Sequence, residues 1–297
     1  MSTGTERIRT HTVSGPDGLR LHVRECGDPA GPPIVFIHGM SASHACWARQ
    51  YESRLADHYR LVAYDLRGHG MSDKPVDPGR YAEGSLWAGD LAAVIDELGL
   101  DRPVLVGWSY GSAVICDYVR ARGQDRIAAI DLVAPAAMLG PAAFGALIGP
   151  GFLDHWADLV ADDIETNIRG LRAFLRACVA MPLEAEIMEN ALCWNMVVPA
   201  KVRANLGGRE IDDTAVLRTL DVPVLVTQGR ADSVVLPAMA EHILATCPAA
   251  EVSWYDGVGH MPHLEQPDRF NAELAALVER AMTRPRSRAS SISSAAH

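Results

Sequence analysis

Pro103-Val104-Leu105-Val106-Gly107-Trp108-Ser109-Tyr110-Gly111 joins an apolar, β-branched run to a helical run that extends from Ser112 to Val119. A strand that ends in G-x-S-x-G and continues as a helix makes a sharp turn that lifts the serine hydroxyl clear of the backbone. Gly107 and Gly111 leave room for the strand and the helix to cross closely, where a Cβ atom would collide. The stretch therefore predicts a strained strand-to-helix turn with Ser109 at its tip.

Short β-like runs alternate with helical runs on both sides of this turn. The runs 33–37 and 61–64 are continuously apolar, as in strands covered on both faces, and 19–24 alternates as a half-exposed strand does. Further strands are predicted at 127–133 and 222–227. A strand at 251–255 and helices at 85–98, 237–245 and 267–282 complete the pattern. Alternating strands and helices predict an α/β fold with a mainly parallel sheet covered by helices on both faces.

The alternation stops between residues 138 and 213. This stretch is rich in Ala, Leu and Met, has helical periodicity at 164–179 and 183–196, and shows no convincing strand. We interpret it as a helical insert that divides the α/β core into residues 1–137 and 214–284. Residues 285–297 are rich in Arg and Ser and are expected to be a disordered tail.

Composition excludes several classes of protein. The 297 residues are 48% hydrophobic and 22% charged, as in a globular protein, and the formal net charge of −10 disfavours nucleic acid and anionic membrane surfaces as partners. The six cysteines are scattered without a C-x-x-C pair, and neither a secretory leader nor a membrane-spanning apolar run is visible. We expect a cytoplasmic protein with reduced thiols, whose oligomeric state, monomer or homodimer, the sequence leaves open.

A serine hydroxyl needs a base to act as a nucleophile, and the base needs an acid to orient it. Asp232 follows the predicted strand 222–227, and His260 follows the predicted strand 251–255. All three side chains come just after strands, at the edge of a parallel sheet where ligands bind. Asp221 and Asp256 are less suitable acids, because one precedes its strand and the other ends the histidine's own strand.

An acyl-transfer reaction also needs backbone N–H groups that bind the developing oxyanion. Tyr110 directly follows the serine, and Met40 lies in the loop after the predicted strand 33–37. These two N–H groups are the candidate oxyanion hole. We expect His38, His263 and the segment 65–72 to be structural, and we expect no metal site and no cofactor.

The chain resembles the α/β-hydrolase superfamily over residues 20–280, apart from the insert. The resemblance rests on the strand-to-helix turn at Gly107–Gly111, which we call the elbow, and on His38-Gly39. Three further motifs support it, namely Asp65-Leu66-Arg67-Gly68-His69-Gly70-Met71-Ser72, Gly229-Arg230-Ala231-Asp232 and Gly259-His260-Met261-Pro262-His263-Leu264-Glu265-Gln266-Pro267. It implies a sheet of about eight strands, a Ser109–His260–Asp232 triad, and a helical cap formed by the insert.

These features favour a serine hydrolase of a carboxylic ester or lactone of a small to medium apolar acid. Haloalkane dehalogenases and epoxide hydrolases are disfavoured because they carry aspartate at the elbow. Perhydrolase-like members tend to carry proline in the oxyanion loop, which Met40-Ser41-Ala42 lacks. A carbon–carbon bond hydrolase of ring-cleavage diketones and a non-catalytic small-molecule receptor remain as alternatives.

Specificity is expected to depend on bulky side chains beside the serine and in the insert, since a lidded hydrolase pocket is mostly apolar. The candidate pocket residues are Trp47, Trp108, Met138, Phe144 and Trp194.

Overall fold

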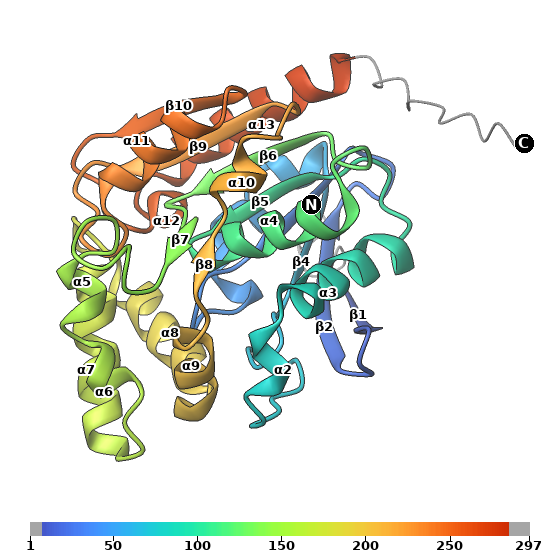
Figure 1. Ribbon diagram of the computed structural model, residues 1–297. Coiled ribbons are helices and arrows are strands. Elements are labelled where there is room, and N and C mark those ends of the chain that lie inside the picture. The colour runs from blue at the N-terminus through green and yellow to red at the C-terminus, as the bar shows by residue number, and fades with distance from the viewer. Residues whose placement is uncertain (1–7, 285–297) are drawn as a thin grey trace, which may run out of the picture.

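Strand β5 (Val104–Trp108) lies in the middle of an eight-stranded sheet in the computed structural model, which describes residues 8–284 (Figure 1). The strand order is β1-β2-β4-β3-β5-β6-β9-β10, with β4 to β10 parallel and β1, β2 and β4 paired antiparallel. The other strands are β1 (Arg9–Ser14), β2 (Arg20–Gly27), β3 (Pro33–Ile37), β4 (Arg60–Tyr64), β6 (Ala129–Val133), β9 (Val224–Gly229) and β10 (Ala250–Tyr255).

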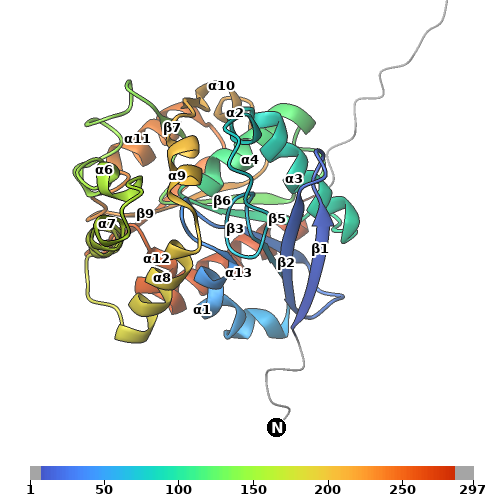
Figure 2. The ribbon, with the colours of Figure 1, turned by 90° about the horizontal axis from the view of Figure 1, so that it is seen from below.

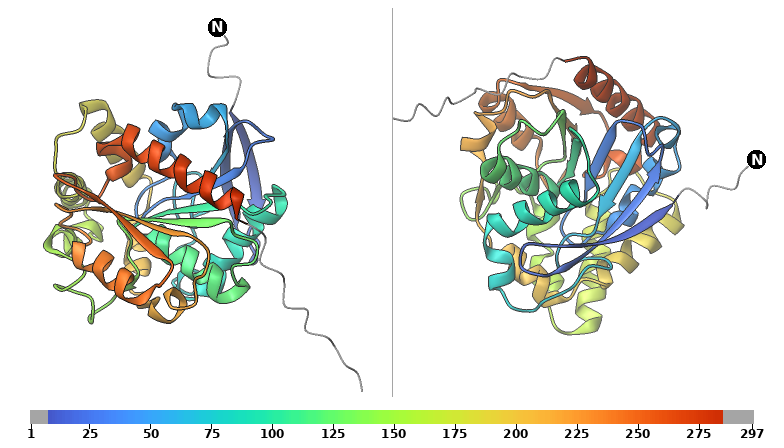
Figure 3. Two further views of the ribbon diagram at one scale, coloured as in Figure 1. Left: turned by 90° about the horizontal axis from the view of Figure 1, so that it is seen from above. Right: turned by 90° about the vertical axis from the view of Figure 1, so that its right-hand side faces the viewer.

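Helices cover both faces of the sheet, as Figure 2 and the left view of Figure 3 show. One face carries α3 (Gly84–Glu97), α4 (Tyr110–Arg122), α10 (Thr214–Leu217) and α11 (Pro237–Thr246); the other carries α1 (Ala48–Tyr51), α12 (Pro262–Glu265) and α13 (Pro267–Thr283). Two 3-10 turns, η2 (His44–Trp47) and η3 (Arg54–Asp57), and the short helix α2 (Gly79–Ala82) lie in the loops. Because both faces are covered, every residue of β5, β6 and β9 is buried.

The expected α/β fold is confirmed, and the predicted strands and helices recur with shifts of a few residues at their ends. The sequence pattern does not reveal β1, because only Val13 of this edge strand is buried and the strand therefore lacks an apolar face. The predicted tail, 285–297, lies outside the described residues.

The segment between β6 and β9 is mainly helical and gathers at the lower left and centre of Figure 1. It contains α5 (Pro150–Leu153), α6 (Trp156–Leu159), α7 (Ile164–Ala177), α8 (Ala185–Met196) and α9 (Ala200–Gly207). The expectation that it contains no strand is wrong, because β7 (Met138–Leu139) pairs antiparallel with β8 (Ile211–Asp212). Two-residue strands are too short for a visible periodicity, yet this pair brings the two ends of the segment together.

A buried arginine holds the helices of this segment together. Arg203 in α9 donates from Nε to Leu159 O (2.6 Å), from Nη1 to Asn195 O (3.0 Å), and from Nη2 to Asn167 Oδ1 (2.7 Å). Burial lowers the pKa of the Arg203 guanidinium to about 10. The hydrogen bonds to carbonyl and amide oxygens offset the cost of burying this charge, and they connect α7, α8 and α9.

The crossing of β5 and α4 gives a test of the fold. A Cβ atom on Gly111 would overlap Ile37 O and lie 3.0 Å from His38 O, both of them backbone atoms of the neighbouring strand end. We expect Gly111→Ala to lower the free energy of unfolding by about 1–3 kcal/mol, as overpacking does, measured by urea denaturation. Gly208→Ala is the matched control, since its Cβ atom would meet nothing closer than 3.6 Å. Equal stability of the two variants would contradict the close crossing.

Candidate active site

Ser109 occupies a strained turn between β5 and α4. Its φ of 53° and ψ of −115° lie in a region that residues with a side chain rarely adopt. The Ser109 N–H donates to Val133 O (2.9 Å), and Ser109 O accepts from Ser112 N (3.0 Å) and Ala136 N (3.2 Å). These bonds to β6 and α4 hold a conformation that costs on the order of 1–3 kcal/mol. The side chain remains partly exposed.

His260 and Asp232 form a buried pair. His260 Nδ1 and Asp232 Oδ2 are 2.8 Å apart, and the two residues are 2% and 3% exposed. Asp232 Oδ1 accepts from the N–H groups of Val234 (2.8 Å) and Val235 (3.0 Å). The Gln228 amide donates to Asp232 Oδ2 (3.2 Å). Three hydrogen-bond donors besides the imidazole therefore hold the carboxylate in place.

The backbone of His260 is held from two directions. Trp108 Nε1 donates to His260 O (2.8 Å), and the His260 N–H donates to Cys178 O (2.7 Å). Trp108 immediately precedes Ser109, and Cys178 directly follows α7 as its C-cap. The position of the histidine therefore depends on the elbow and on the helical segment together.

The loop after β3 turns tightly against Ser109. The Ala42 N–H donates to Gly39 O (3.2 Å), and Ser41 has a φ of 65°, which is the pattern of a type II turn with Met40 and Ser41 at its centre. A Cβ atom on Gly39 would lie 3.1 Å from Ser109 Cβ, so glycine permits this approach. Met40 and Tyr110 both line the cavity described below.

Two buried histidines brace this turn. His69 Nε2 accepts the Ser41 N–H (3.1 Å) while His69 Nδ1 donates to Arg67 O (2.9 Å). His38 Nδ1 donates to Gly39 O (2.8 Å), and His38 Nε2 accepts the Leu66 N–H (3.0 Å). Burial lowers the pKa of His38 to about 4 and that of His69 to about 3. Both rings are neutral at physiological pH, and all four ring nitrogens form hydrogen bonds with backbone groups of the loops after β3 and β4.

A narrow, mostly apolar cavity lies between the sheet edge and the helical segment. Its volume is about 40 Å³. Its lining comprises Gly39, Met40, Ala42, Trp108, Ser109, Tyr110, Ala136, Leu139, Ile148, Phe152, Phe174, Leu175, Asn195, Val234, Val235, His260 and Met261. The structure therefore brings Ser109, His260 and both predicted oxyanion donors to one cavity, with Asp232 directly behind His260.

Among the predicted pocket residues, Trp108 lines the cavity and the other four do not. Trp47 is fully buried with its ring against Phe36 of β3 and His263 of α12, so it belongs to the core and not to the cavity wall. Phe144 is 41% exposed and is not part of the cavity lining. These assignments are corrected, because bulk and position in the sequence did not reveal which way each side chain faces.

The remaining two corrections concern the insert. Met138 belongs to β7, where its neighbour Leu139 lines the cavity in its place, and Trp194 precedes the lining residue Asn195 on α8. Asn195 and the apolar side chains of α5 and α7 were not predicted as cavity residues. The helical periodicity of these segments predicts that one face is buried, but it does not predict which buried residues line the cavity.

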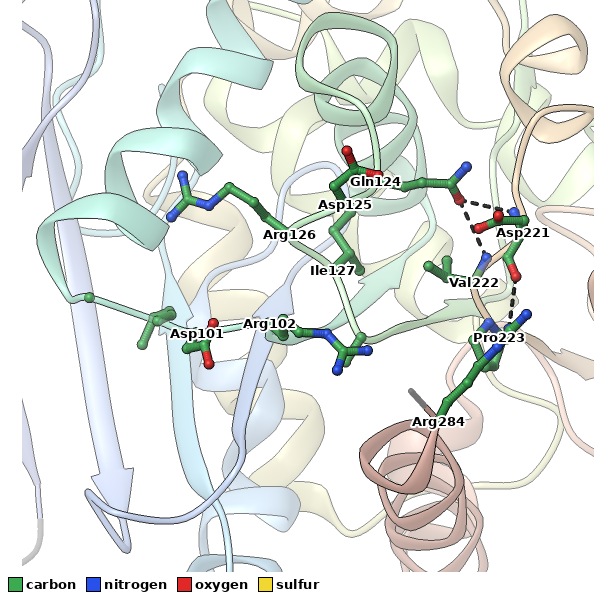
Figure 4. A pocket seen from close by; sticks show the side chains of 13 residues that line it. Asp101, Arg102, Gln124, Asp125, Arg126, Ile127, Asp221, Val222, Pro223 and Arg284 are labelled. Atoms are coloured by element: carbon green, nitrogen blue, oxygen red, sulfur yellow. Dashed lines mark hydrogen bonds between the residues drawn. The ribbon is translucent and has the colours of Figure 1, made fainter. Parts of the chain in front are cut away.

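A second, wider cavity of about 500 Å³ lies at the opposite edge of the sheet (Figure 4). It is bounded by 99–102, 124–128, 221–223 and Arg284, which precede the amino ends of the central strands or follow α13. Gln124 Oε1 accepts the Asp221 N–H (2.9 Å), and Arg284 donates to Asp221 O (2.8 Å). These contacts tie the connecting loops together, and none of the predicted site residues lines this cavity.

One group of potential metal ligands occurs within residues 8–284. His22, His44 and Asp65 have ligand atoms within 4.8 Å of one another. Asp65 Oδ1 accepts from His44 N (2.7 Å) and is 2.9 Å from His44 Nδ1, while Asp65 Oδ2 accepts from Met71 N (2.8 Å). The carboxylate thus joins the loops after β3 and β4, and the group lies outside the lining of the Ser109 cavity.

The chain belongs to the alpha/beta hydrolase family, whose model matches residues 34–273. The structure is similar to that of a protein assigned as an aryl esterase from Burkholderia cenocepacia, with 37% identity, a TM-score of 0.88, and coverage of 93% of this chain and 100% of the other. An esterase from Rhodococcus sp. ECU1013 is 34% identical with a TM-score of 0.86, covering 91% and 98%. A non-heme haloperoxidase from Rhodococcus erythropolis is 28% identical over 276 residues, which cover 90% of this chain and 98% of that protein.

No helix between residues 8 and 284 combines the length and the apolar character needed to cross a bilayer.

His263 gives a prediction for the dependence of stability on pH. Its ring is buried against Trp47 and Trp108, neither ring nitrogen has a hydrogen-bond partner within residues 8–284, and burial lowers its pKa to about 3. The unfolded chain therefore binds this proton at a higher pH than the folded chain, so the histidine destabilises the fold as the pH falls below its unfolded value of 6.5.

We expect the stability of His263→Leu relative to the wild type to improve by about 2 kcal/mol between pH 7 and pH 5. Urea denaturation of both proteins at each pH measures the difference. A constant difference across this range would mean that the buried ring is already able to bind a proton in the folded state.

Proposed function

We propose that this protein is a serine hydrolase that cleaves a carboxylic ester or lactone through an acyl-enzyme on Ser109. The observation that carries the proposal is the buried His260–Asp232 hydrogen bond behind a cavity that Ser109 also lines. The two esterase structures, at 34% and 37% identity, support the same reaction class.

In the proposed mechanism Ser109 Oγ attacks the substrate carbonyl carbon while His260 Nε2 takes the hydroxyl proton. The negative charge that develops on the carbonyl oxygen is stabilised by the N–H groups of Met40 and Tyr110. His260 then returns the proton to the leaving alcohol, and the acyl-enzyme remains. Water attacks the acyl-enzyme with His260 as base, which releases the acid and restores Ser109.

Asp232 keeps the proton of His260 on Nδ1, which leaves Nε2 as the basic nitrogen. Since Asp232 Oδ1 is held by two backbone N–H groups, the carboxylate orients the imidazole without large motion. It also stabilises the imidazolium that forms in each transition state.

The cavity supports a small to medium, largely apolar substrate. Its lining is apolar on the insert side, where Leu139, Ile148, Phe152, Phe174 and Leu175 contribute, and its volume is small. We propose that residues 138–213 act as the cap of this site, because these side chains come from that segment.

Two other reactions and a non-catalytic role are less well supported than ester hydrolysis. The oxyanion turn Met40-Ser41-Ala42 has no proline, which disfavours perhydrolase-type chemistry of the kind suggested by the haloperoxidase relative. A carbon–carbon hydrolase of ring-cleavage diketones would need to accommodate a charged, extended acid in this narrow apolar cavity. A non-catalytic receptor does not require the His260–Asp232 pair.

Replacement of the nucleophile tests the proposed function. We expect the wild type to be labelled by a fluorophosphonate probe and to hydrolyse p-nitrophenyl butanoate, and Ser109→Ala to lose both, because the acyl-enzyme cannot form. Ser253→Ala on β10 is a matched control, because Ser253 does not line the cavity. Equal turnover by folded Ser109→Ala would rule out the acyl-enzyme, and a folded wild type that is neither labelled nor active would favour the receptor.

His69 tests the role of the oxyanion turn. We expect His69→Leu to lower kcat for p-nitrophenyl butanoate about 10- to 100-fold with little change in KM, because the Ser41 N–H loses its acceptor and the Met40 N–H is no longer held in place. Steady-state kinetics separate the two constants, and His69→Gln, which retains an acceptor, should recover part of kcat. A proportional rise in KM with kcat unchanged would place the effect in substrate binding.

A further inference from the structure

Asn195 is a buried polar residue in the otherwise apolar, insert-side wall of the Ser109 cavity. It lies in the last turn of α8, is 3% exposed, and lines the cavity with Phe174 and Leu175 of α7. A buried amide is costly unless both its N–H₂ and its oxygen are hydrogen-bonded.

The orientation of the Asn195 amide follows from its one hydrogen bond. Nδ2 donates to Ala191 O (2.8 Å), one turn earlier on the same helix. Only the N–H₂ group can face a carbonyl oxygen, since the reverse orientation would place two acceptors together. Asn195 Oδ1 is therefore the polar side-chain atom of this residue that has no hydrogen-bond partner within residues 8–284.

This oxygen is distinguished from the other unpaired polar atoms of the protein. Buried side-chain nitrogen and oxygen atoms without a partner occur at several places within residues 8–284, including Trp47 Nε1 and His263. Among the residues that carry them, Asn195 is the one that lines the Ser109 cavity. An unpaired acceptor at this place points to a ligand that supplies the donor.

The backbone at Asn195 is held rigidly. Arg203 Nη1 donates to Asn195 O (3.0 Å) and to Val198 O (2.7 Å), and the Arg203 side chain is itself buried. The same arginine that connects α7, α8 and α9 thus holds the backbone at Asn195, and the bond from Nδ2 to Ala191 O orients the amide. A site that is fixed before binding loses little entropy when the ligand binds.

We propose that Asn195 is a specificity-determining residue that accepts a hydrogen bond from the substrate through Oδ1. The substrate class is an ester or lactone that carries a hydroxyl or an amide N–H in the part that lies beneath α8. Both groups supply the same chemistry, a neutral donor within a small, otherwise apolar molecule. This inference rests on the proposed function, because it concerns the substrate of the same cavity.

Two pairs of esters test the inference on the wild-type protein. Methyl 3-hydroxybutanoate is compared with methyl 3-methylbutanoate, in which a methyl group replaces the hydroxyl. Methyl N-acetylglycinate is compared with methyl N-acetyl-N-methylglycinate, which lacks the N–H. We expect kcat/KM to favour the donor-bearing ester about 10- to 100-fold in at least one pair, and the pair that shows the preference identifies the donor.

Asn195→Leu, which keeps the shape and removes the acceptor, should reduce this preference to about onefold. Asn205→Leu in α9 is the matched control and should keep the wild-type ratio, since Asn205 donates to Val76 O and does not line the cavity. The ratio is measured within one protein preparation, so a loss of stability in either variant does not change its meaning.

Hydrolysis of all four esters without a preference in either pair overturns the role of Asn195 and leaves the proposed function intact. A preference that persists in Asn195→Leu overturns it as well. If the wild type hydrolyses none of these esters and no p-nitrophenyl ester, the proposed function fails and the inference fails with it.

Discussion

The backbone of Ser109 is the constraint on which the rest of the site depends. Its φ of 53° is unfavourable for serine, and hydrogen bonds from β6 and α4 maintain it. The tight crossing that results requires a glycine in the first turn of α4 and another in the loop after β3, since the elbow contacts both strand ends. A relaxed conformation at this position would separate the hydroxyl, the turn at Met40 and the wall formed by Trp108.

The helical segment between β6 and β9 is bound directly to the histidine. The carbonyl oxygen of Cys178, the C-cap of α7, accepts a hydrogen bond from the His260 N–H, while Trp108 of the elbow donates to His260 O. A displacement of α7 would therefore move the proposed base as well as the cavity wall. The segment contributes to the position of the proposed base as much as to substrate selection, and its own rigidity derives from the buried Arg203.

The sequence predicted the elements that a local pattern encodes. Ser109, His260 and Asp232 each follow a predicted strand, so the order of strands along the chain was sufficient to place them at one edge of the sheet. The cavity wall was not predictable in this way, because whether Trp47 or Asn195 faces the cavity depends on how separate helices pack. Trp47 turned out to be core, and the pairing of β7 with β8 is a long-range contact between strands too short to have a period.

The surroundings of four buried histidines distinguish His260 from His38, His69 and His263. His38 and His69 each use one nitrogen as donor and the other as acceptor within the loops, so a second proton on either ring would break a backbone contact. His263 is surrounded by aromatic rings, and burial lowers its pKa. His260 alone among these four has a carboxylate on Nδ1 and a place in the cavity lining. The Asp232 carboxylate therefore orients the ring of His260, as the proposed base requires.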